Sequence, residues 1–387
     1  MLPEYRIVAG FMPLTDSLLL VVAKERGFTQ AEGIDLTLVR ESSWANIRDR
    51  VAVGHFDVAH MLAPMPIAAT LGLTPIADPM IAPMVLGLGG NAVTVSRALW
   101  DRLAANGALA DLRPGPVGKA LAAVAESTET RLRFGVVHPH SGHNYELRYW
   151  LAASGIDPDR TVEIVVLPPP LMPDAIEMGA IDGYCVGEPW NSISVKAGTG
   201  RIATVKQLIW SSSPEKVLGV SERWAATHPE ALAALLRALY RAAQWCGVPA
   251  NHREAAALLG RSAYLDCPAE LIERGLSGRL MAGEDDGVSV PEFYVPYSHH
   301  ATLPRPVHAM WFYAQMVRWG HVPHVPRHAE LARGTFAPDI YRSAIGPIAG
   351  DLPETDTDRL DGAAFFDGRD FDAADLKGYI ASQRPYA

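Results

Sequence analysis

The 387-residue chain has 49% hydrophobic and 20% charged residues, a composition that predicts folded globular domains and excludes a largely disordered protein. Its formal net charge is -9 and no block of Lys and Arg stands out, which argues against direct binding to nucleic acid. No stretch of about 18 or more uninterrupted apolar residues occurs, so no membrane-spanning helix is expected.

The first ninety residues alternate between strand-like and helix-like segments. Strands are expected at 5–10, 34–39 and 56–62, and helices at 16–27 and 42–54. Thr15 or Asp16 would cap the first helix and Gly27 would end it, whereas Ser42 or Ser43 would cap the second. An order of strand, helix, strand, helix and strand predicts a parallel α/β sheet.

After the glycine-rich stretch LGLGG, residues 86–90, the chain predicts a second α/β lobe. Helices are expected at 97–112, 117–127 and 143–155, strands at 133–137 and 162–167, and one more helix and strand within 170–186. The predicted domains are therefore lobe II at 91–186 and a discontinuous lobe I at 1–90 and 187–387. LGLGG lacks the spacing of a nucleotide-binding loop, so we interpret it as a hinge or a close approach of the backbone.

The C-terminal third is predicted to be helical and to complete a domain. Residues 227–247 form an amphipathic helix with Thr227 and Glu230 as a capping box. Further helices are expected at 253–260 and 307–320, before an acidic, turn-rich tail at 352–370.

Two residue types that often bind metals give no metal site here. The three cysteines, Cys185, Cys246 and Cys267, are far apart and predict buried free thiols. His138, His140 and His143 fall within six residues, but a proline follows the first, and Glu146 is the only carboxylate nearby. The histidines at 321, 324 and 328 are interpreted as a solvated loop. We therefore expect neither a metal nor a cofactor.

The segment HPHSGHN predicts the start of a helix. Ser141 is the expected cap, Gly142 allows close backbone approach, and His143 falls in the first turn. The N–H groups of such a helix start can bind an anion, although His143 could equally be a local residue beside the cap. Trp44, at a second helix start, is either a core residue or a pocket wall with one N–H donor.

Several longer stretches together resemble the nitrate- and bicarbonate-binding proteins of ABC importers. They include GFMPLTDSLLLVVAKERG, SSWANIRD, HSGHNYELRYWLAASGI, GAIDGYCVGEPWN and PEKVLGVSERW, of which EPWN and PEKVLG are the most specific. The resemblance runs from about Tyr5 to residue 320. It implies an α/β, two-lobed, periplasmic-binding-protein-like (type II) fold with a helical C-terminal extension, and no enzymatic activity.

The resemblance also implies which residues bind the anion. Carried over onto this sequence, the nitrate site consists of Trp44, Asn91, Gly142, His143 and Lys216, with Asn91 where the family usually has Gln. Lys216 would supply one positive charge and the others oriented donors, with no carboxylate beside the ligand. Bicarbonate needs a hydrogen-bond acceptor that this set lacks, which favours nitrate or nitrite. Alanine at Trp44, Asn91, His143 or Lys216 is expected to weaken binding and leave the fold intact.

The first predicted strand begins within a few residues of Met1, without a recognisable signal peptide, so we expect a cytoplasmic protein. Within the family, this resembles the cytoplasmic nitrate/nitrite sensor that holds an RNA-binding ANTAR-domain antiterminator and releases it when nitrate binds. Two alternatives stay open. One is the solute-binding component of a nitrate or bicarbonate ABC importer, and the other is an enzyme related to thiamine-pyrimidine synthases, whose cysteine-rich motif is absent here.

Overall fold

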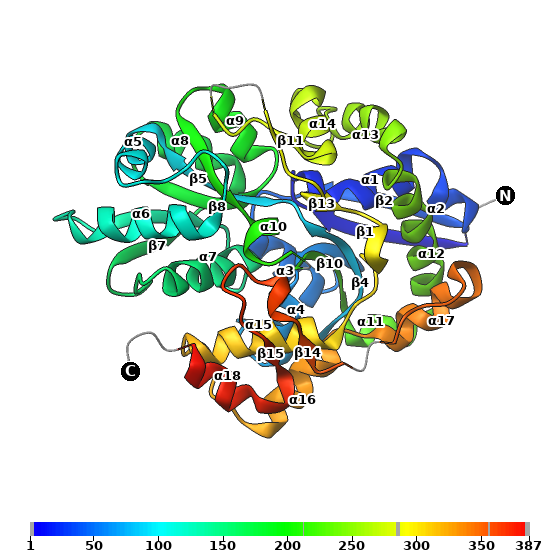
Figure 1. Ribbon diagram of the computed structural model, residues 1–387. Coiled ribbons are helices and arrows are strands. Elements are labelled where there is room, and N and C mark those ends of the chain that lie inside the picture. The colour runs from blue at the N-terminus through cyan, green and yellow to red at the C-terminus, as the bar shows by residue number, and fades with distance from the viewer. Residues whose placement is uncertain (1–3, 212, 284–286, 355–356, 384–387) are drawn as a thin grey trace. The chain divides into compact units, whose positions relative to one another are not determined.

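In the computed structural model, which describes residues 4–211, 213–283, 287–354 and 357–383, the chain forms two units with separate β-sheets (Figure 1). Unit 1 comprises residues 1–88, 214–273 and 295–358. Unit 2 comprises residues 89–213, 274–294 and 359–387. The chain therefore passes between the units several times.

The six-stranded sheet of unit 1 has the order β13-β4-β10-β3-β1-β2. Its strands are β1 (Tyr5–Phe11), β2 (Ile34–Arg40), β3 (Val58–Leu62), β4 (Met80–Gly89), β10 (Pro214–Ser221) and β13 (Tyr294–Val295). β1 runs parallel to β2 and β3, while β10 is antiparallel to β3 and β4. β3 and β10 are buried along their whole lengths, as expected for central strands covered on both faces.

Helices cover both faces of this sheet. Because β2 and β3 lie on either side of β1, right-handed crossovers put the helices after β1 and after β2 on opposite faces. One group comprises α1 (Leu18–Glu25), α2 (Phe28–Ala31), α12 (Pro229–Cys246), α13 (His252–Leu259) and α17 (Pro338–Ala349). The other includes α4 (Pro64–Thr70), α15 (Pro306–Arg318) and α16 (Pro326–Thr335), and it is drawn apart from the first in Figure 1. α3 (Trp44–Ala52) follows β2, and α11 (Glu222–Thr227) follows β10.

The five-stranded sheet of unit 2 has the order β7-β6-β8-β5-β9. Its strands are β5 (Asn91–Ser96), β6 (Leu132–Val136), β7 (Val162–Val166), β8 (Gly183–Gly187) and β9 (Gly200–Val205). β6 is parallel to β7 and β8, while β5 is antiparallel to β8 and β9.

Most helices of unit 2 lie in the connections between these strands, and the last two follow β9. They are α5 (Arg97–Ala105), α6 (Pro114–Glu126), α7 (Gly142–Ala153), α8 (Met172–Glu177), α9 (Trp190–Lys196), α10 (Lys206–Ile209) and α18 (Leu376–Ser382). Two short hairpins complete the unit, β11 (Arg279–Leu280) with β12 (Val288–Ser289) and β14 (Arg359–Leu360) with β15 (Phe371–Asp372). α14 (Ala269–Ser277) crosses the boundary between the two units.

Most elements predicted from the sequence are present, but two helix starts differ. Ser43 and Ser141 cap α3 and α7 as expected, each accepting a backbone N–H three residues on. The prediction of a capping box formed by Thr227 and Glu230 is wrong. Thr227 is the last residue of the separate helix α11, and its hydroxyl donates a hydrogen bond to the Arg223 carbonyl. α1 begins at Leu18 after a 3₁₀ turn, Thr15–Ser17, so Asp16 is not its cap.

The division into units differs from the predicted boundaries beyond residue 186. Residues 187–213 belong to unit 2 because β9 extends its sheet by pairing with β5. Part of the tail also belongs there, since Phe365 stacks on Trp210 and Asp367 accepts a hydrogen bond from the Tyr149 hydroxyl. The C-terminal third thus completes both units. Within the tail, residues 355 and 356 lie outside the described residues.

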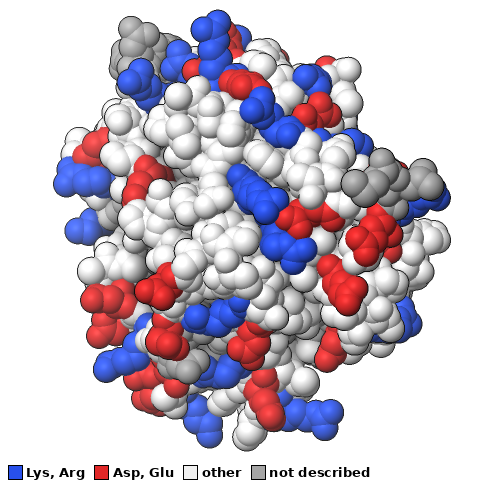
Figure 2. Space-filling view, turned by 90° about the vertical axis from the view of Figure 1, so that its right-hand side faces the viewer, with Lys and Arg blue, Asp and Glu red and all other residues white. Residues whose placement is uncertain are grey.

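On the face drawn in Figure 2, Lys and Arg are interspersed with Asp and Glu, so no large area there carries charge of a single sign. No helix in the described ranges is long and apolar enough to cross a membrane. The three cysteines are buried and unpaired with one another, as predicted.

The LGLGG stretch makes the close backbone approach that its composition predicts. Gly89 and Gly90 have φ angles of 74° and 90°, and the Gly90 N–H donates to the Phe293 carbonyl at 2.6 Å. A Cβ atom at Gly89 would overlap this same carbonyl oxygen. Glycine is therefore required at position 89 both for its backbone angle and for space.

We predict that Gly89→Ala destabilises the protein more than Gly72→Ala. Gly72 has nearly the same φ, 73°, but no atom within 4 Å of a Cβ placed there, so its substitution carries only the left-handed backbone cost of about 1–2 kcal/mol. Urea denaturation of the two variants measures the difference. Equal midpoints would show that the Phe293 carbonyl moves aside without cost.

Candidate functional site

The strand directions of unit 2 bring several polar residues to one edge of its sheet. β6 and β8 are parallel, so their carboxyl ends share an edge, and β5 starts at that edge because it is antiparallel to β8. Asn91 at the start of β5, the Ser141–His143 turn after β6, and Glu188 after β8 therefore gather there. Ligands of open α/β sheets bind at such an edge.

The loop before α7 is held by its own hydrogen bonds. The Ser141 hydroxyl donates to the His138 carbonyl at 2.7 Å and accepts the Asn144 N–H at 3.0 Å. His138 Nδ1 accepts the backbone N–H of His140 at 3.0 Å. His138 thus has a structural role, and no group of metal-ligating side chains occurs among the described residues.

The predicted residues of unit 2 are buried at this edge. Gly142 is the first residue of α7, and His143 follows it with a fully buried side chain in the first turn. Asn91 is also fully buried, and neither atom of its amide has a hydrogen-bond partner in the described part of the chain. Asn91 and the positive end of the 12-residue helix α7 are suited to an anion.

A buried ion pair that the sequence did not predict lies in the same unit. Lys206 Nζ lies 2.9 Å from the Glu146 carboxylate, and both side chains are at most 2% exposed. The Ser213 hydroxyl donates to the same Glu146 oxygen. Lys206 follows β9, whose last residue is paired with Ala92 beside Asn91. Lys206 therefore brings an ammonium group near this edge, and Glu146 compensates its charge.

Unit 1 has an equivalent edge, which holds the other two predicted residues. Trp44 begins α3 after β2, and Lys216 lies near the start of the antiparallel strand β10. Lys216 Nζ lies 5.5 Å from the centre of the Trp44 ring, which also packs on the His60 ring at 5.4 Å. Trp44 is 1% exposed, and its indole N–H has no partner among the described residues.

The expectation that no carboxylate accompanies this set is wrong. Lys216 Nζ lies 2.7 Å from an oxygen of Asp16 and 2.7 Å from an oxygen of Glu215, all three being buried. Asp16 follows β1 at the same edge. Glu215 precedes Lys216 in β10, where the register with β4 is irregular, and such bulges redirect side chains that would otherwise alternate between faces.

His60 completes this cluster in its neutral form. The backbone N–H of Met12 donates to Nδ1 at 3.4 Å, so the ring proton is on Nε2, which lies 2.9 Å from Asp16. Burial lowers the pKa of His60, although Asp16 opposes the shift. Burial by itself would raise the pKa of Asp16, but Lys216 and His60 outweigh it and the pKa is lowered. Lys216 is therefore shared between two acidic side chains, one of which, Asp16, also contacts His60.

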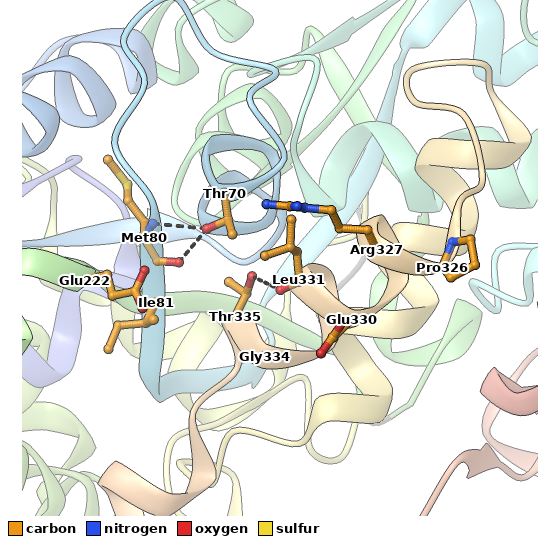
Figure 3. A pocket seen from close by; sticks show the side chains of 10 residues that line it. All are labelled: Thr70, Met80, Ile81, Glu222, Pro326, Arg327, Glu330, Leu331, Gly334 and Thr335. Carbon is orange, nitrogen blue, oxygen red and sulfur yellow. Dashed lines mark hydrogen bonds between the residues drawn. The ribbon is translucent and has the colours of Figure 1, made fainter.

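The cavity in Figure 3 lies at the other edge of the unit 1 sheet. It has a volume of about 570 Å³ and is lined by the start of β4, the start of α11 and the helix α16. Arg327 extends from α16 toward Thr70 in Figure 3, and Glu222 and Glu330 also line the cavity. None of the residues predicted to bind the anion lines this cavity, so it is separate from the predicted site.

The structure thus places the five predicted residues at the carboxyl edges of two sheets, Trp44 and Lys216 in one and the rest in the other. Sequence reasoning missed Asp16, His60, Glu215, Glu188 and Lys206. The signal for Asp16 and Glu188 was their position in the segments that connect a predicted strand to the following helix. No pattern in the sequence indicated the ion-pair partners.

Comparison with known proteins gives consistent matches over nearly the whole chain. The model of the NMT1-like family matches residues 2–260. The nitrate/nitrite binding protein NrtA of Synechococcus elongatus is 32% identical, with 98% of this chain and 86% of that protein covered. The nitrate import ATP-binding protein NrtC of Synechocystis is 36% identical, with 98% of this chain covered. The chain spans about half the length (55%) of the first curated relatives it matches.

The fold is shared with a solved structure. The crystal structure of the periplasmic nitrate-binding protein NrtA from Synechocystis PCC 6803 matches with a TM-score of 0.89 at 28% identity, covering 99% of this chain and all of that one. This match confirms the predicted α/β, periplasmic-binding-protein-like fold.

We predict that replacing Lys216 destabilises the protein, which corrects the expectation that its removal leaves the fold intact. Lys216→Met retains most of the apolar volume but leaves Asp16 and Glu215 buried without their counter-ion, a change that typically costs about 3–5 kcal/mol. Denaturant unfolding measures this loss. Lys119→Met, at an exposed position of α6, should change stability by less than about 0.5 kcal/mol.

Adding Asp16→Asn and Glu215→Gln to Lys216→Met should restore part of the lost stability, because no uncompensated carboxylate then remains. A Lys216→Met protein as stable as the Lys119→Met control would contradict the buried charge cluster.

Proposed function

The chain belongs to the NMT1-like family, and from this membership we propose that it is a solute-binding protein for nitrate, nitrite or a closely similar small oxyanion. The observation that carries the proposal is the match to the nitrate-binding protein NrtA over the full length of the chain. The polar edge of each sheet carries residues of the kind that such a ligand needs.

The chemistry of the two edges suits a planar anion of single charge. In unit 2, the start of α7 and the amide of Asn91 offer donors from a buried surface. In unit 1, the indole N–H of Trp44 is buried beside Lys216. Both lysines near the edges are already paired with carboxylates, so binding depends on oriented donors more than on net positive charge.

Of the two physiological roles considered, that of the solute-binding component of an ABC importer is better supported. The relatives are described as a periplasmic nitrate-binding protein and as parts of nitrate and bicarbonate transporters. The cytoplasmic sensor that releases an ANTAR-domain antiterminator rests on the sequence resemblance alone, and none of these relatives supports the expected cytoplasmic location. An enzymatic role has no support in these relatives.

We predict that nitrate or nitrite raises the thermal stability of the purified protein. Ligand present at about 100 times its dissociation constant adds roughly 2.7 kcal/mol to the free energy of unfolding. Thermal unfolding with nitrate, nitrite, bicarbonate, sulfate and chloride measures the selectivity. His143→Ala should abolish the response, while His55→Ala, at an exposed position, should retain it. A response to none of these ions, or to sulfate only, would refute the proposal.

The two roles can be separated by gel filtration with an ANTAR-domain antiterminator. For an importer component, we expect no complex with or without nitrate. A complex that dissociates when nitrate is added would instead establish the sensor role and overturn our preference.

A further inference from the structure

Glu188 is a buried acid, and only one of its two carboxyl oxygens has a hydrogen-bond partner among the described residues. It follows β8 at the polar edge of unit 2, joined to Pro189 by a cis peptide bond, and is 2% exposed. Its Oε2 accepts the backbone N–H of Ser192 at 3.1 Å. Its Oε1 is buried without a hydrogen-bond partner in the described ranges of the chain. An acceptor of this kind is costly unless something else pairs with it.

The position of Glu188 places this oxygen near the predicted ligand-binding residues of the same unit. Asn91 is paired with Gly187 across the β5–β8 ladder, and the Glu188 N–H donates to the Gly90 carbonyl at 3.3 Å. Asn91 itself has an amide without partners among the described residues. Gly275 of α14 lies against the Glu188 side chain, since a Cβ there would be 3.4 Å from Glu188 Cγ. The acid is thus covered from one side, and its backbone is bonded next to Asn91, whose amide is also without a partner in the described residues.

No counter-ion stabilises the charged form of Glu188. Throughout the part of the chain that the structure describes, no Lys, Arg or His forms an ion pair with it. Burial raises the pKa of Glu188 to about 7, although the Ser192 N–H and, more weakly, the side chains of Ser192 and Asn191 oppose this shift. Tyr184 on β8 is close enough that Glu188 contributes to raising the pKa of its phenol. The other charged groups on the two helices next to Glu188 are Lys196 in the last turn of α9, and Glu270, Glu273 and Arg274 on α14.

We propose that Glu188 is an additional ligand-binding residue that adapts its protonation to the bound oxyanion. As a neutral acid it donates a hydrogen bond to an anion that carries no proton, and as a carboxylate it accepts one from an anion that does. This inference rests on the proposed function and specifies how its site treats different oxyanions. The carboxylate form of Glu188 also supplies the hydrogen-bond acceptor that bicarbonate needs and that the five residues predicted from the sequence lack.

The two ligand classes then differ in their proton balance. Nitrate has only acceptor oxygens, so it binds together with one proton, which is taken from solvent by the Glu188 carboxylate and shared with a nitrate oxygen. Bicarbonate brings its own hydroxyl proton and donates it in a hydrogen bond to the carboxylate, so no proton is taken up. The neutral acid avoids two adjacent negative charges when nitrate binds, whereas with bicarbonate the hydrogen bond from the ligand hydroxyl offsets part of the repulsion between the two anions.

Isothermal titration calorimetry at pH 8, in two buffers of different ionisation enthalpy, measures the proton balance directly. We expect nitrate binding to take up close to one proton and bicarbonate binding to take up about none. Above pH 7 the dissociation constant for nitrate should rise about tenfold per pH unit, because each unit lowers the population of the neutral acid tenfold.

Glu188→Gln is the informative variant, since its amide donates a hydrogen bond at every pH. We expect nitrate binding by this variant to lose both the proton uptake and the pH dependence. Glu177→Gln, an exposed acid of α8 in the same unit, removes the same charge and should behave as the unsubstituted protein does. A role of Glu188 in holding the start of α9 alone would not change the number of protons taken up.

The possible failures are distinguishable. Nitrate binding without proton uptake, or with uptake that persists in Glu188→Gln, would overturn the role of Glu188 and leave the proposed function intact. Binding of none of the oxyanions would overturn both. If Glu188→Gln is poorly folded, the pH dependence and the buffer comparison on the unsubstituted protein decide the question without it.

Discussion

One reversed strand in each sheet determines which residues can act together in this protein. In unit 1 the antiparallel strand β10 starts at the edge where β1, β2 and β3 end, and in unit 2 β5 starts where β6 and β8 end. Residues about one hundred to two hundred positions apart in the sequence therefore share an edge. Asp16 and Lys216 form an ion pair for this reason, and Asn91 and Glu188 are neighbours for the same reason.

The electrostatics of the two edges differ from a simple basic pocket. Lys216 and Lys206 are buried, and each is compensated by carboxylates, so neither edge offers an unopposed positive charge. A weakly hydrated monoanion loses little by leaving water and can be bound by oriented N–H groups. An anion of higher charge would lose more solvation and would meet the excess of acidic groups. The arrangement therefore discriminates by charge and by hydrogen-bonding pattern together.

The same buried charges connect binding to stability. Lys216, Asp16, Glu215 and His60 form one cluster in which each member compensates another, so a substitution that tests ligand contact also disturbs the packing of unit 1. The acid of unit 2 lacks such compensation. Proteins retain an unpaired buried polar group mainly where a ligand or catalysis makes use of it.

The sequence by itself determined much of the secondary structure, the α/β class and the family, but it did not predict the strands β4, β5, β9 and β10. Hydrophobic patterns predicted β1 to β3 and β6 to β8, and Ser43 and Ser141 marked two helix starts, because such signals act over a few neighbouring residues. The tertiary structure alone decided that residues 187–213 and part of the tail join unit 2, and that Asp16 is a lysine partner and not a helix cap. Strand pairing and the partners of buried charges depend on contacts between distant segments, which local patterns do not encode.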